Sequence, residues 1–285
     1  KLWGIKMNGI VEHDALIHQP TANYVNYYGM ANGLPLDDPD SGFDKTHPWK
    51  NRDPRFYKDI NYDGERVVAK DLEGNDAWRQ YADLQTNGRF RDEKEGSRTG
   101  YLLYKFIDKT CNKYDDGYGW SHHFNLHLPW MRLAEVYLLY AEAVTEGYGS
   151  PSAKASTCSL SAIDAVHKIR ERSGVADVNA KFTGDKEKFM SELRRERAVE
   201  LAFEGQRFND LRRWLLLDKY PYNIKTSQEF LRVGNINTED IKEEQVSGWS
   251  EKQILKRNFS EKQYWLPLKK KDCQIYPEFK QNPGW

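Results

Sequence analysis

The chain has 285 residues, enough for one large domain or two small ones. Lys plus Arg and Asp plus Glu both number 43, so no overall charge directs the protein to nucleic acid or to an anionic membrane, although this balance leaves local patches open. The sequence holds no apolar run of about eighteen residues, so no segment is predicted to span a membrane. Its first residues, KLWGIKMNGI, lack the pattern of a signal peptide, and we expect the sequence to begin within a longer protein.

Residues 1–128 are rich in turn-forming residues, and two segments between the turns have strand character. Side chains alternate over residues 56–61, and the Asp63-Gly64 pair that follows suits a tight hairpin turn. Residues 101–107, YLLYKFI, are rich in β-forming residue types and are mixed on both faces. We therefore expect short strands in both places, within a part of the chain that consists mainly of loops.

Residues 129–217 are predicted to be helical. Pro129 suits a first helical turn, and Gly147 is placed to end a helix that runs to about Glu146. Apolar residues recur at helical spacing over residues 160–173, and Gly174 suits a left-handed cap. We expect these two helices to form an αα-hairpin.

The segment 192–214, ELRRERAVELAFEGQRFNDLRRW, is highly charged, yet its apolar residues point in nearly every direction on a helix. Because a helix that is apolar all round is normally buried, we expect neighbouring elements to cover it. Those elements should supply Arg or backbone groups to a stripe of carboxylates that would otherwise repel one another. An arginine cluster that grips an anion is the less favoured alternative. Gly205 should end this helix and start another. The stripe consists of Glu192, Glu196, Glu200 and Glu204.

The tail, residues 218–285, carries four prolines and is expected to form an extended strap, with one helix around residues 251–256. Helical hairpins that stack in pairs suggest the tetratricopeptide repeat, although the loop between the helices is too long for the standard unit and its proline is missing. The predicted fold is mainly α, with tetratricopeptide-like hairpins (an α–α superhelix) that support long irregular loops and a few short β-strands.

Several segments together resemble the SusD-like (RagB/SusD) family. They are RRERAVELAFEGQRFNDLRRW, RLAEVYLLYAEA, IRERSG, NRDPRFY, TANYVNYYGMANGLPL, TGYLLYKFI and the terminal YWLPL and NPGW, and they occur in the family's order from about residue 20 to residue 285. The resemblance implies a single C-terminal domain, with a loop-rich ligand-facing part (1–128), helical hairpins (129–217) and a C-terminal strap (218–285). The N-terminal half and its lipid-bearing cysteine would precede it.

The resemblance also implies a role. Members of this family are outer-membrane nutrient-binding lipoproteins of Bacteroidetes-type bacteria that cap a TonB-dependent, SusC-like transporter and are not enzymes. Their ligands are glycans or, in some members, peptides. The implied location is the cell surface, through a lipid anchor on the full-length protein. The motifs that match are scaffold motifs, so they transfer a role without transferring a binding site.

The ligand site must therefore be predicted from chemistry. Sugar receptors combine exposed aromatic planes with amide, carboxylate or Arg groups, and such groups favour loops on a rigid scaffold. Three loops fit: SGFDKTHPWKNRD, NDAWRQY and YDDGYGWSHHFN. The alternative for each loop is that its rings pin it to the protein's own core. The candidate ligand-binding residues are Trp49, Trp78, Tyr81, Phe43 and Trp120.

No cofactor or metal is expected. The histidines of HHFNLH do not converge on one helical face, the Asp pairs at 37–38 and 115–116 are not followed by a calcium-loop pattern, and the three cysteines, Cys111, Cys158 and Cys273, form no CxxC motif. No arrangement singles out the two carboxylates that a glycosidase needs. A nutrient-binding uptake component is favoured over a helical protein-interaction scaffold and a carbohydrate-active enzyme.

Overall fold

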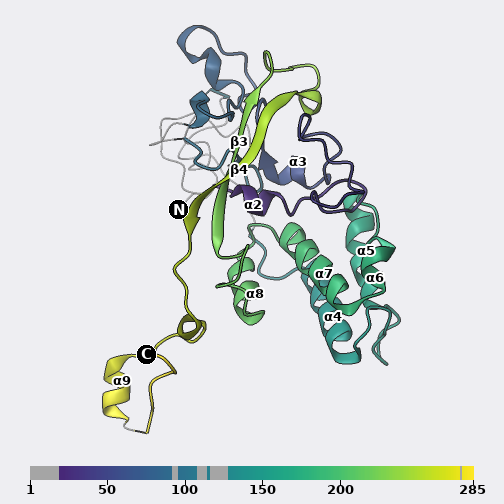
Figure 1. Cartoon of the computed structure of the whole chain (residues 1–285), viewed down its shortest axis with the longest axis vertical. Helices are drawn as coiled ribbons and strands as arrows, with labels where there is room; N and C mark the ends of the chain where they lie inside the picture. The colour runs from purple at the N-terminus through teal and green to yellow at the C-terminus, as the bar shows by residue number, and fades with distance from the viewer. Residues whose placement is uncertain (1–18, 92–95, 108–113, 116–127, 277) are drawn as a thin grey trace.

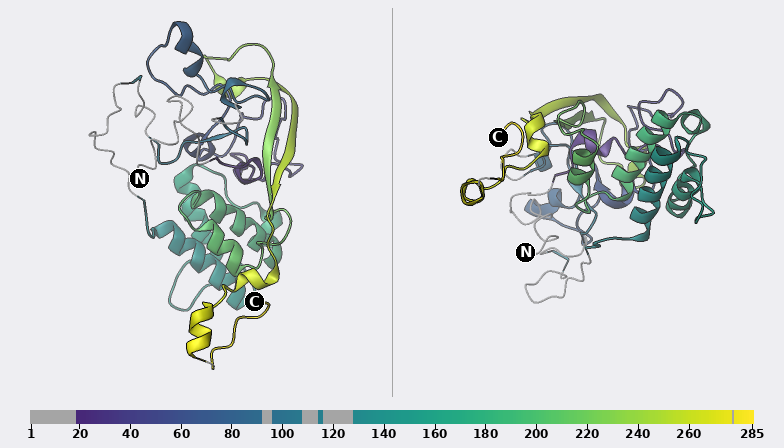
Figure 2. Two further views of the ribbon diagram at one scale, coloured as in Figure 1. Left: turned by 90° about the vertical axis from the view of Figure 1, so that its left-hand side faces the viewer. Right: turned by 90° about the horizontal axis from the view of Figure 1, so that it is seen from below.

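The computed structural model describes residues 19–91, 96–107, 114–115, 128–276 and 278–285. The described part is helix-rich, as predicted, and is built from helices at one end and loops with a long β-hairpin at the other (Figure 1). Turning the molecule shows the hairpin along one edge of the body, with the C-terminal segment projecting beyond the helices (Figure 2). None of the helices in these residues is both long and apolar enough to cross a lipid bilayer.

Three helices form the helical layer: α4 (Leu133–Tyr148), α5 (Ala162–Ser173) and α7 (Lys186–Glu200). Their apolar faces form one core, in which Leu138, Val166 and Phe189 are at most 1% exposed. A capping box starts α5, where the Ser161 side chain and the Asp164 backbone and side chain bond reciprocally, and Gly174 at φ 71° ends it as predicted. Helix α4 runs through Gly147 and ends instead at Gly149, which has the positive φ that the cap requires.

The three glutamates of the stripe that lie on α7, Glu192, Glu196 and Glu200, are buried and are neutralised mainly from outside the helix, as predicted. Glu192 and Glu196 accept hydrogen bonds from Arg170 on α5 at 2.9 and 2.8 Å. Arg55 reaches Glu196 and Glu200 at 2.6 and 3.0 Å from the loop-rich part. Burial alone would raise the pKa of Glu196, but Arg55 and Arg170 outweigh it and hold that pKa far below its usual value. The stripe therefore joins the helices to the rest of the protein.

Two short helices flank this layer, α6 (Ala180–Thr183) and α8 (Arg207–Arg213). Gly205, at φ 86°, lies in the turn between α7 and α8, although α7 already ends at Glu200. Leu211 is buried on α8, whereas Phe208 and Leu215 are 54% and 58% exposed. The short helix therefore buries only part of its apolar surface.

The loop-rich part contains little regular structure: α2 (Ala22–Val25), α3 (Phe56–Asp59), β1 (Ile60–Asn61), η2 (Gly74–Arg79), η3 (Arg89–Arg91) and β2 (Leu102–Leu103). The strand predicted from residue 56 is mostly wrong, because residues 56–59 form a helical turn. Only Ile60 and Asn61 pair, in antiparallel register with Leu103 and Leu102. Phe56, in the helical turn, and Ile60, the residue that follows it, are both buried. Their spacing in the sequence produced the apparent strand alternation.

The tail forms a long antiparallel hairpin, β3 (Ile224–Arg232) and β4 (Val246–Lys256), which corrects the predicted strap and the predicted helix at 251–256. Phe230 is buried in the same core as Trp49, while β4 is largely exposed. The burial is supplied by α2 and the loop residues packed against the hairpin, and these are distant in sequence. Short helices η4 (Ile241–Glu243), η5 (Glu261–Tyr264) and α9 (Lys270–Ile275) complete the chain.

Candidate functional site

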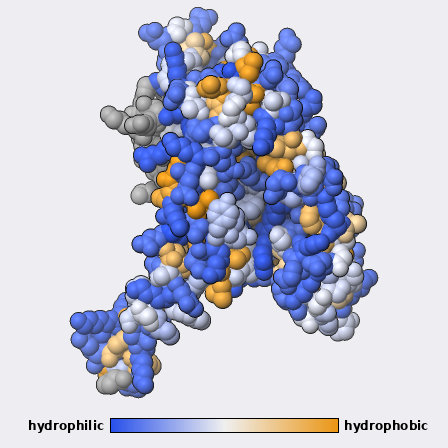
Figure 3. Space-filling view, in the orientation of Figure 1, coloured by the Kyte–Doolittle hydropathy of each residue, from blue (hydrophilic) through white to orange (hydrophobic). Residues whose placement is uncertain are grey.

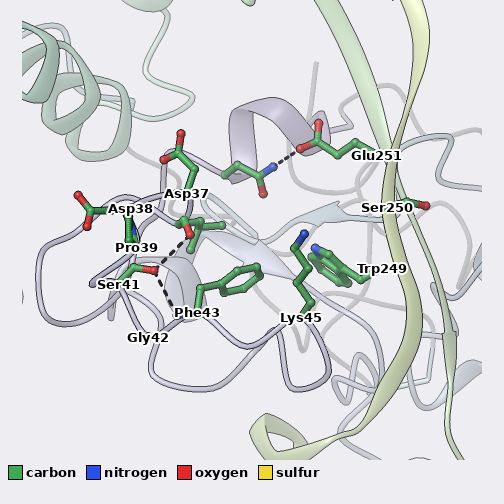
Figure 4. Close-up of a pocket in the computed structure, with 12 residues that line it drawn as sticks. Asp37, Asp38, Pro39, Ser41, Gly42, Phe43, Lys45, Trp249, Ser250 and Glu251 are labelled. Atoms are coloured by element: carbon green, nitrogen blue, oxygen red, sulfur yellow. Dashed lines mark hydrogen bonds between the residues drawn. The ribbon is translucent and has the colours of Figure 1, made fainter.

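A pocket of about 610 Å³ opens between the loop at residues 36–45 and strand β4. Figure 4 shows the Phe43 ring directed toward Lys45 and Trp249. The ring centroids of Phe43 and Trp249 are 6.2 Å apart, and the rings meet edge to face. We call this pair of rings the aromatic corner. Carboxylate, amide, hydroxyl and ammonium groups surround the corner. The polar lining residues are Asn26, Asp37, Asp38, Ser41, Lys45, Ser250 and Glu251.

Arg52 holds the loop that forms one wall of the pocket. Its side chain is 1% exposed and donates hydrogen bonds to carbonyl oxygens on both sides of the loop, Tyr28 at 2.6 Å and Pro48 at 3.1 Å. Its guanidinium lies 4.5 Å from the Phe56 ring centroid and 5.7 Å from that of Phe43. The guanidinium N–H groups of Arg52 are thus bonded to the protein's own backbone. Arg52 therefore stabilises the loop and is not a candidate ligand-binding group.

The opposite wall is held by strand β4. Both carboxylate oxygens of Glu251 accept hydrogen bonds, from the Asn26 amide at 2.5 Å and the Thr226 hydroxyl at 2.6 Å. The Trp249 ring packs against the buried rings of Trp49, at 5.2 Å, and Phe230, at 5.7 Å. Because these contacts fix the ring from behind, its remaining surface is presented to the pocket in a defined orientation.

The charges around the pocket are only partly paired. Lys181 of α6 donates to Asp38 at 2.5 Å, and this hydrogen bond lowers the pKa of the carboxyl and keeps it ionised. Among the described residues, no ion pair involves Asp37 or Lys45. Within the described residues, the pocket therefore offers hydrogen-bond acceptors and the unpaired ammonium of Lys45 beside two rings, which suits a ligand with many hydroxyl groups.

The structure separates the predicted site residues. Phe43 lines the pocket, as the prediction requires. Trp49 is 0% exposed, so the prediction that it presents a ring to ligand is wrong: it stacks on Phe56 and supports Trp249 from inside the core. The alternative weighed for these loops, a ring that pins the loop to the core, holds for this residue.

Trp78 and Tyr81 lie elsewhere. Trp78 is half-buried and contacts the guanidinium groups of Arg79 and Arg89, at 4.4 and 5.5 Å from its ring centroid. Tyr81 forms an isolated bridge with Arg66. Neither residue lines the pocket that Phe43 lines. Trp120 lies outside the described residues.

Sequence reasoning missed Trp249 and Glu251, because the tail was interpreted as a strap with a helix at residues 251–256. IKTSQEFLR and VSGWSEKQILK each contain three β-branched or aromatic residues, which is a weak strand signal in both segments. Strand β4 is also exposed on most of its length, so it has no buried face that the sequence could mark. Its strand state depends on pairing with β3, which is a non-local contact.

No group of three or more His, Cys, Asp or Glu side chains arranged to hold a metal occurs among the residues that the structure describes. The loop at 115–116 and the histidines at 122–127, weighed as metal sites in the sequence, lie largely or wholly outside those residues.

Comparison with known proteins gives the family. A sequence model of the SusD family matches residues 15–285. The chain belongs to the SusD family. A SusD-like protein from Bacteroides fragilis is similar in structure, with a TM-score of 0.64 and 26% sequence identity over 94% of this chain and 47% of its own.

A second SusD-like structure from Bacteroides fragilis, described as a carbohydrate-binding protein, gives a TM-score of 0.56 at 21% identity and covers 91% of this chain and 48% of its own. At that identity it supports the shared fold alone. This SusD family chain spans about half the length of the structures it matches. No curated protein matches it significantly.

Proposed function

We propose that this SusD family chain binds a carbohydrate in the pocket between residues 36–45 and β4, as part of a non-catalytic nutrient receptor at the cell surface. The observation that carries the proposal is the aromatic corner of Phe43 and Trp249, surrounded by hydrogen-bonding groups. A sugar ring presents an apolar C–H face and a rim of hydroxyls, and these two features match a fixed ring beside polar groups. A structure of the same fold is described as a carbohydrate-binding protein, so carbohydrate is the ligand class to test first.

The wider role follows from the family and is part of the proposal. We infer that the full-length protein is lipid-anchored in the outer membrane and delivers its ligand to a SusC-like, TonB-dependent transporter. Helices α4, α5 and α7 would then be the C-terminal part of a tetratricopeptide-like stack. The rest of the stack would correspond to the part of the related structures that this chain does not cover. Peptides are the other ligand class to include in binding tests.

Isothermal titration against a panel of oligosaccharides tests the pocket. We expect Trp249→Ala to weaken binding by about tenfold or more, since a buried or half-buried aromatic at the centre of a contact commonly contributes about 2 kcal/mol. Phe43→Ala should weaken it in the same assay, with less effect on the core. The matched control is Trp265→Ala, which removes a 60% exposed ring in the C-terminal segment.

Trp78→Ala is the variant that separates the two predicted surfaces. If it abolishes binding while Trp249→Ala leaves affinity unchanged, the ligand occupies the loop of residues 75–81 instead. An assay for new reducing ends after long incubation with any bound oligosaccharide separates a receptor from a hydrolase. Sustained release of reducing ends would contradict the non-catalytic role.

A further inference from the structure

A second pocket, of about 450 Å³, adjoins the candidate sugar site and differs from it in charge. Asn26 and Asp37 line both pockets, so the two are neighbours. The first pocket is lined by three carboxylates and one lysine, whereas the second is lined by four cations and two carboxylates. The cations are Lys188, Arg194, Arg195 and Arg207, and the carboxylates are Asp37 and Glu192.

Most of these cations have no acidic partner. Arg195 is committed to Glu192 and to two backbone carbonyls, Tyr27 at 3.0 Å and Gly33 at 2.7 Å. Glu192 is also neutralised by Arg170. Within the described part of the chain, no ion pair involves Lys188, Arg194 or Arg207. These three charges share one pocket, whereas Arg170, Arg195 and Arg197 pair with carboxylates.

Two of the arginines also carry buried N–H groups that have no hydrogen-bond partner among the residues that the structure describes. They are the Arg194 Nε and the Arg207 Nη1 atoms. Both guanidinium groups lie over aromatic rings instead. The guanidinium carbon of Arg194 is 5.5 Å from the ring centroid of Trp214. That of Arg207 is 4.8 Å from the ring centroid of Tyr27 and 5.6 Å from that of Tyr222. A buried donor without an acceptor costs about 1–3 kcal/mol. These two atoms are enclosed by protein, so an anion in the pocket would contact the other N–H groups of the same two pocket-lining guanidinium groups.

The rings give the pocket a second recognition element. Tyr27, Tyr222 and Phe182 line the same space as the unpaired cations. An oxyanion alone would use only the charges, whereas an oxyanion attached to a sugar ring would use both the charges and the apolar ring faces. The chemistry of the lining therefore fits a charged sugar residue better than a free inorganic ion.

We propose that this pocket binds the carboxylate or sulfate group of an acidic saccharide whose neighbouring, uncharged sugar residue occupies the pocket of Phe43 and Trp249. Arg207 and Arg194 supply the guanidinium donors, and Lys188 adds a flexible ammonium. That the anion belongs to a saccharide rests on the proposed carbohydrate function. That this pocket binds an anion does not depend on it. The preferred nutrient is then an acidic polysaccharide.

A matched pair of ligands tests this inference: an oligosaccharide containing glucuronate residues, and the same oligosaccharide with its carboxyl groups reduced to hydroxymethyl groups. We expect the acidic form to bind at least about tenfold more tightly in isothermal titration. This advantage should shrink as ionic strength rises, because screening weakens the attraction between exposed charges. Glucuronate, inorganic sulfate and glucose, followed by NMR titration, distinguish a carboxylate from a sulfate and both from a neutral sugar.

Three variants connect the effect to the pocket. Arg207→Gln and Lys188→Gln should each remove most of the preference for the acidic form, and Lys270→Gln, which removes one positive charge from α9, should leave it intact. Lys188 is exposed, so its replacement preserves the fold even if Arg207→Gln perturbs the packing of Tyr27. Circular dichroism and thermal unfolding check that each variant is folded.

The outcomes separate the two proposals. Equal binding of the acidic and reduced forms, with both lost in Trp249→Ala, would overturn the anion site and leave the carbohydrate function standing. Arg207-dependent binding of inorganic sulfate without binding of glucuronate, glucose or either oligosaccharide would support the anion site and overturn the carbohydrate function. Absence of binding by all five ligands would overturn both.

Discussion

Arg170 is 0% exposed and lies between two carboxylates of α7, with distances of 2.9 Å from its Nη2 to Glu192 and 2.8 Å from its Nε to Glu196. An ion pair of this kind recovers little net free energy compared with apolar residues of the same volume, since both charges lose their hydration. Removing one partner is different, because the other charge is then left buried and uncompensated.

We predict that Arg170→Ala lowers the free energy of unfolding by about 3–5 kcal/mol. Lys168→Ala, on the same helix but with a side chain 48% exposed, should change it by less than about 1 kcal/mol. Urea unfolding followed by circular dichroism measures both. A loss for Arg170→Ala no larger than that for Lys168→Ala would show that the buried glutamates find other partners.

Glu244 provides a test of pH dependence. It is 2% exposed and lies beside Asp63, with Arg232 Nε at 2.5 Å. Burial and then the Asp63 carboxylate raise the pKa of Glu244 to about 9, and Arg232 opposes them only in part. Above the ordinary value of 4.5, the folded state therefore holds a proton that the unfolded state releases. The free energy of unfolding should fall as pH rises from about 4.5 toward 9, by at most about 1.4 kcal/mol per pH unit from this group.

Glu244→Gln should flatten that slope and leave the protein at least as stable as the parent at pH 8.5. Glu243→Gln, at an exposed neighbour that pairs with Lys50, should keep the parent slope. Urea unfolding at pH 5 and pH 8.5 supplies the comparison. The same slope in the parent and in Glu244→Gln would mean that another group holds the proton.

At the scale of elements, the position of the loop at residues 36–45 depends on a contact just before it, between residues 31–33 and the chain that follows α5. Gly33 has φ 83°, and a Cβ built on it would lie 2.7 Å from the carbonyl oxygen of Ala176. The backbone also bonds across this junction, with the Ala176 N–H donating to Ala31 at 3.0 Å. The loop that carries Phe43 is thus positioned by the helical layer, through a glycine that allows close approach.

We predict that Gly33→Ala costs about 1–3 kcal/mol and weakens saccharide binding, because the backbone at this φ is strained for any residue with a Cβ. Gly184→Ala is the matched control. Gly184 has an ordinary helical φ of −85° with no heavy atom within 4 Å of the added carbon, so alanine should be neutral or stabilising by up to about 1 kcal/mol. Thermal unfolding and titration of one ligand separate the two. Equal effects of the two substitutions would contradict the proposed junction.

At the scale of the whole molecule, the C-terminal segment stands apart from the body (Figure 1). Among the described residues, the recorded hydrogen bonds of residues 266–285 remain within residues 262–285, such as those from Trp285 Nε1 to Lys262 and Trp265. Most of the surface shown in Figure 3 is hydrophilic, with apolar groups in separate patches, one of them on this segment. Among the residues that the structure describes, none beyond Tyr264 belongs to the hydrophobic cores of the body.

We predict that deleting residues 266–285 changes the free energy of unfolding of the remaining chain by less than about 1 kcal/mol, because no core contact is removed. Urea unfolding of the shortened and full chains is the measurement. Loss of a cooperative transition in the shortened chain would show that the segment is part of the folding unit.

Local chemistry in the sequence was sufficient to predict the helical layer. Apolar spacing and Gly174 predict α5 and its cap, and the four-residue spacing of the glutamates on a helix that is apolar all round predicts their burial and pairing. The apolar spacing, the cap and the glutamate spacing are local, whereas the arginines that neutralise the glutamates, Arg55 and Arg170, come from other parts of the chain. The combined motifs also predict the SusD family, which the match over residues 15–285 confirms.

The tertiary structure alone decided which rings face solvent. Trp49 and Trp249 have the same side chain, but Trp49 is enclosed by rings from the loops and from β3, while Trp249 covers it and faces the pocket. Strand β4 pairs with β3, and both pack against residues 22–49. These contacts bring Trp49 and Trp249 together across about two hundred residues of sequence. Burial of an aromatic side chain depends on contacts of that range, and no local pattern in the sequence encodes them.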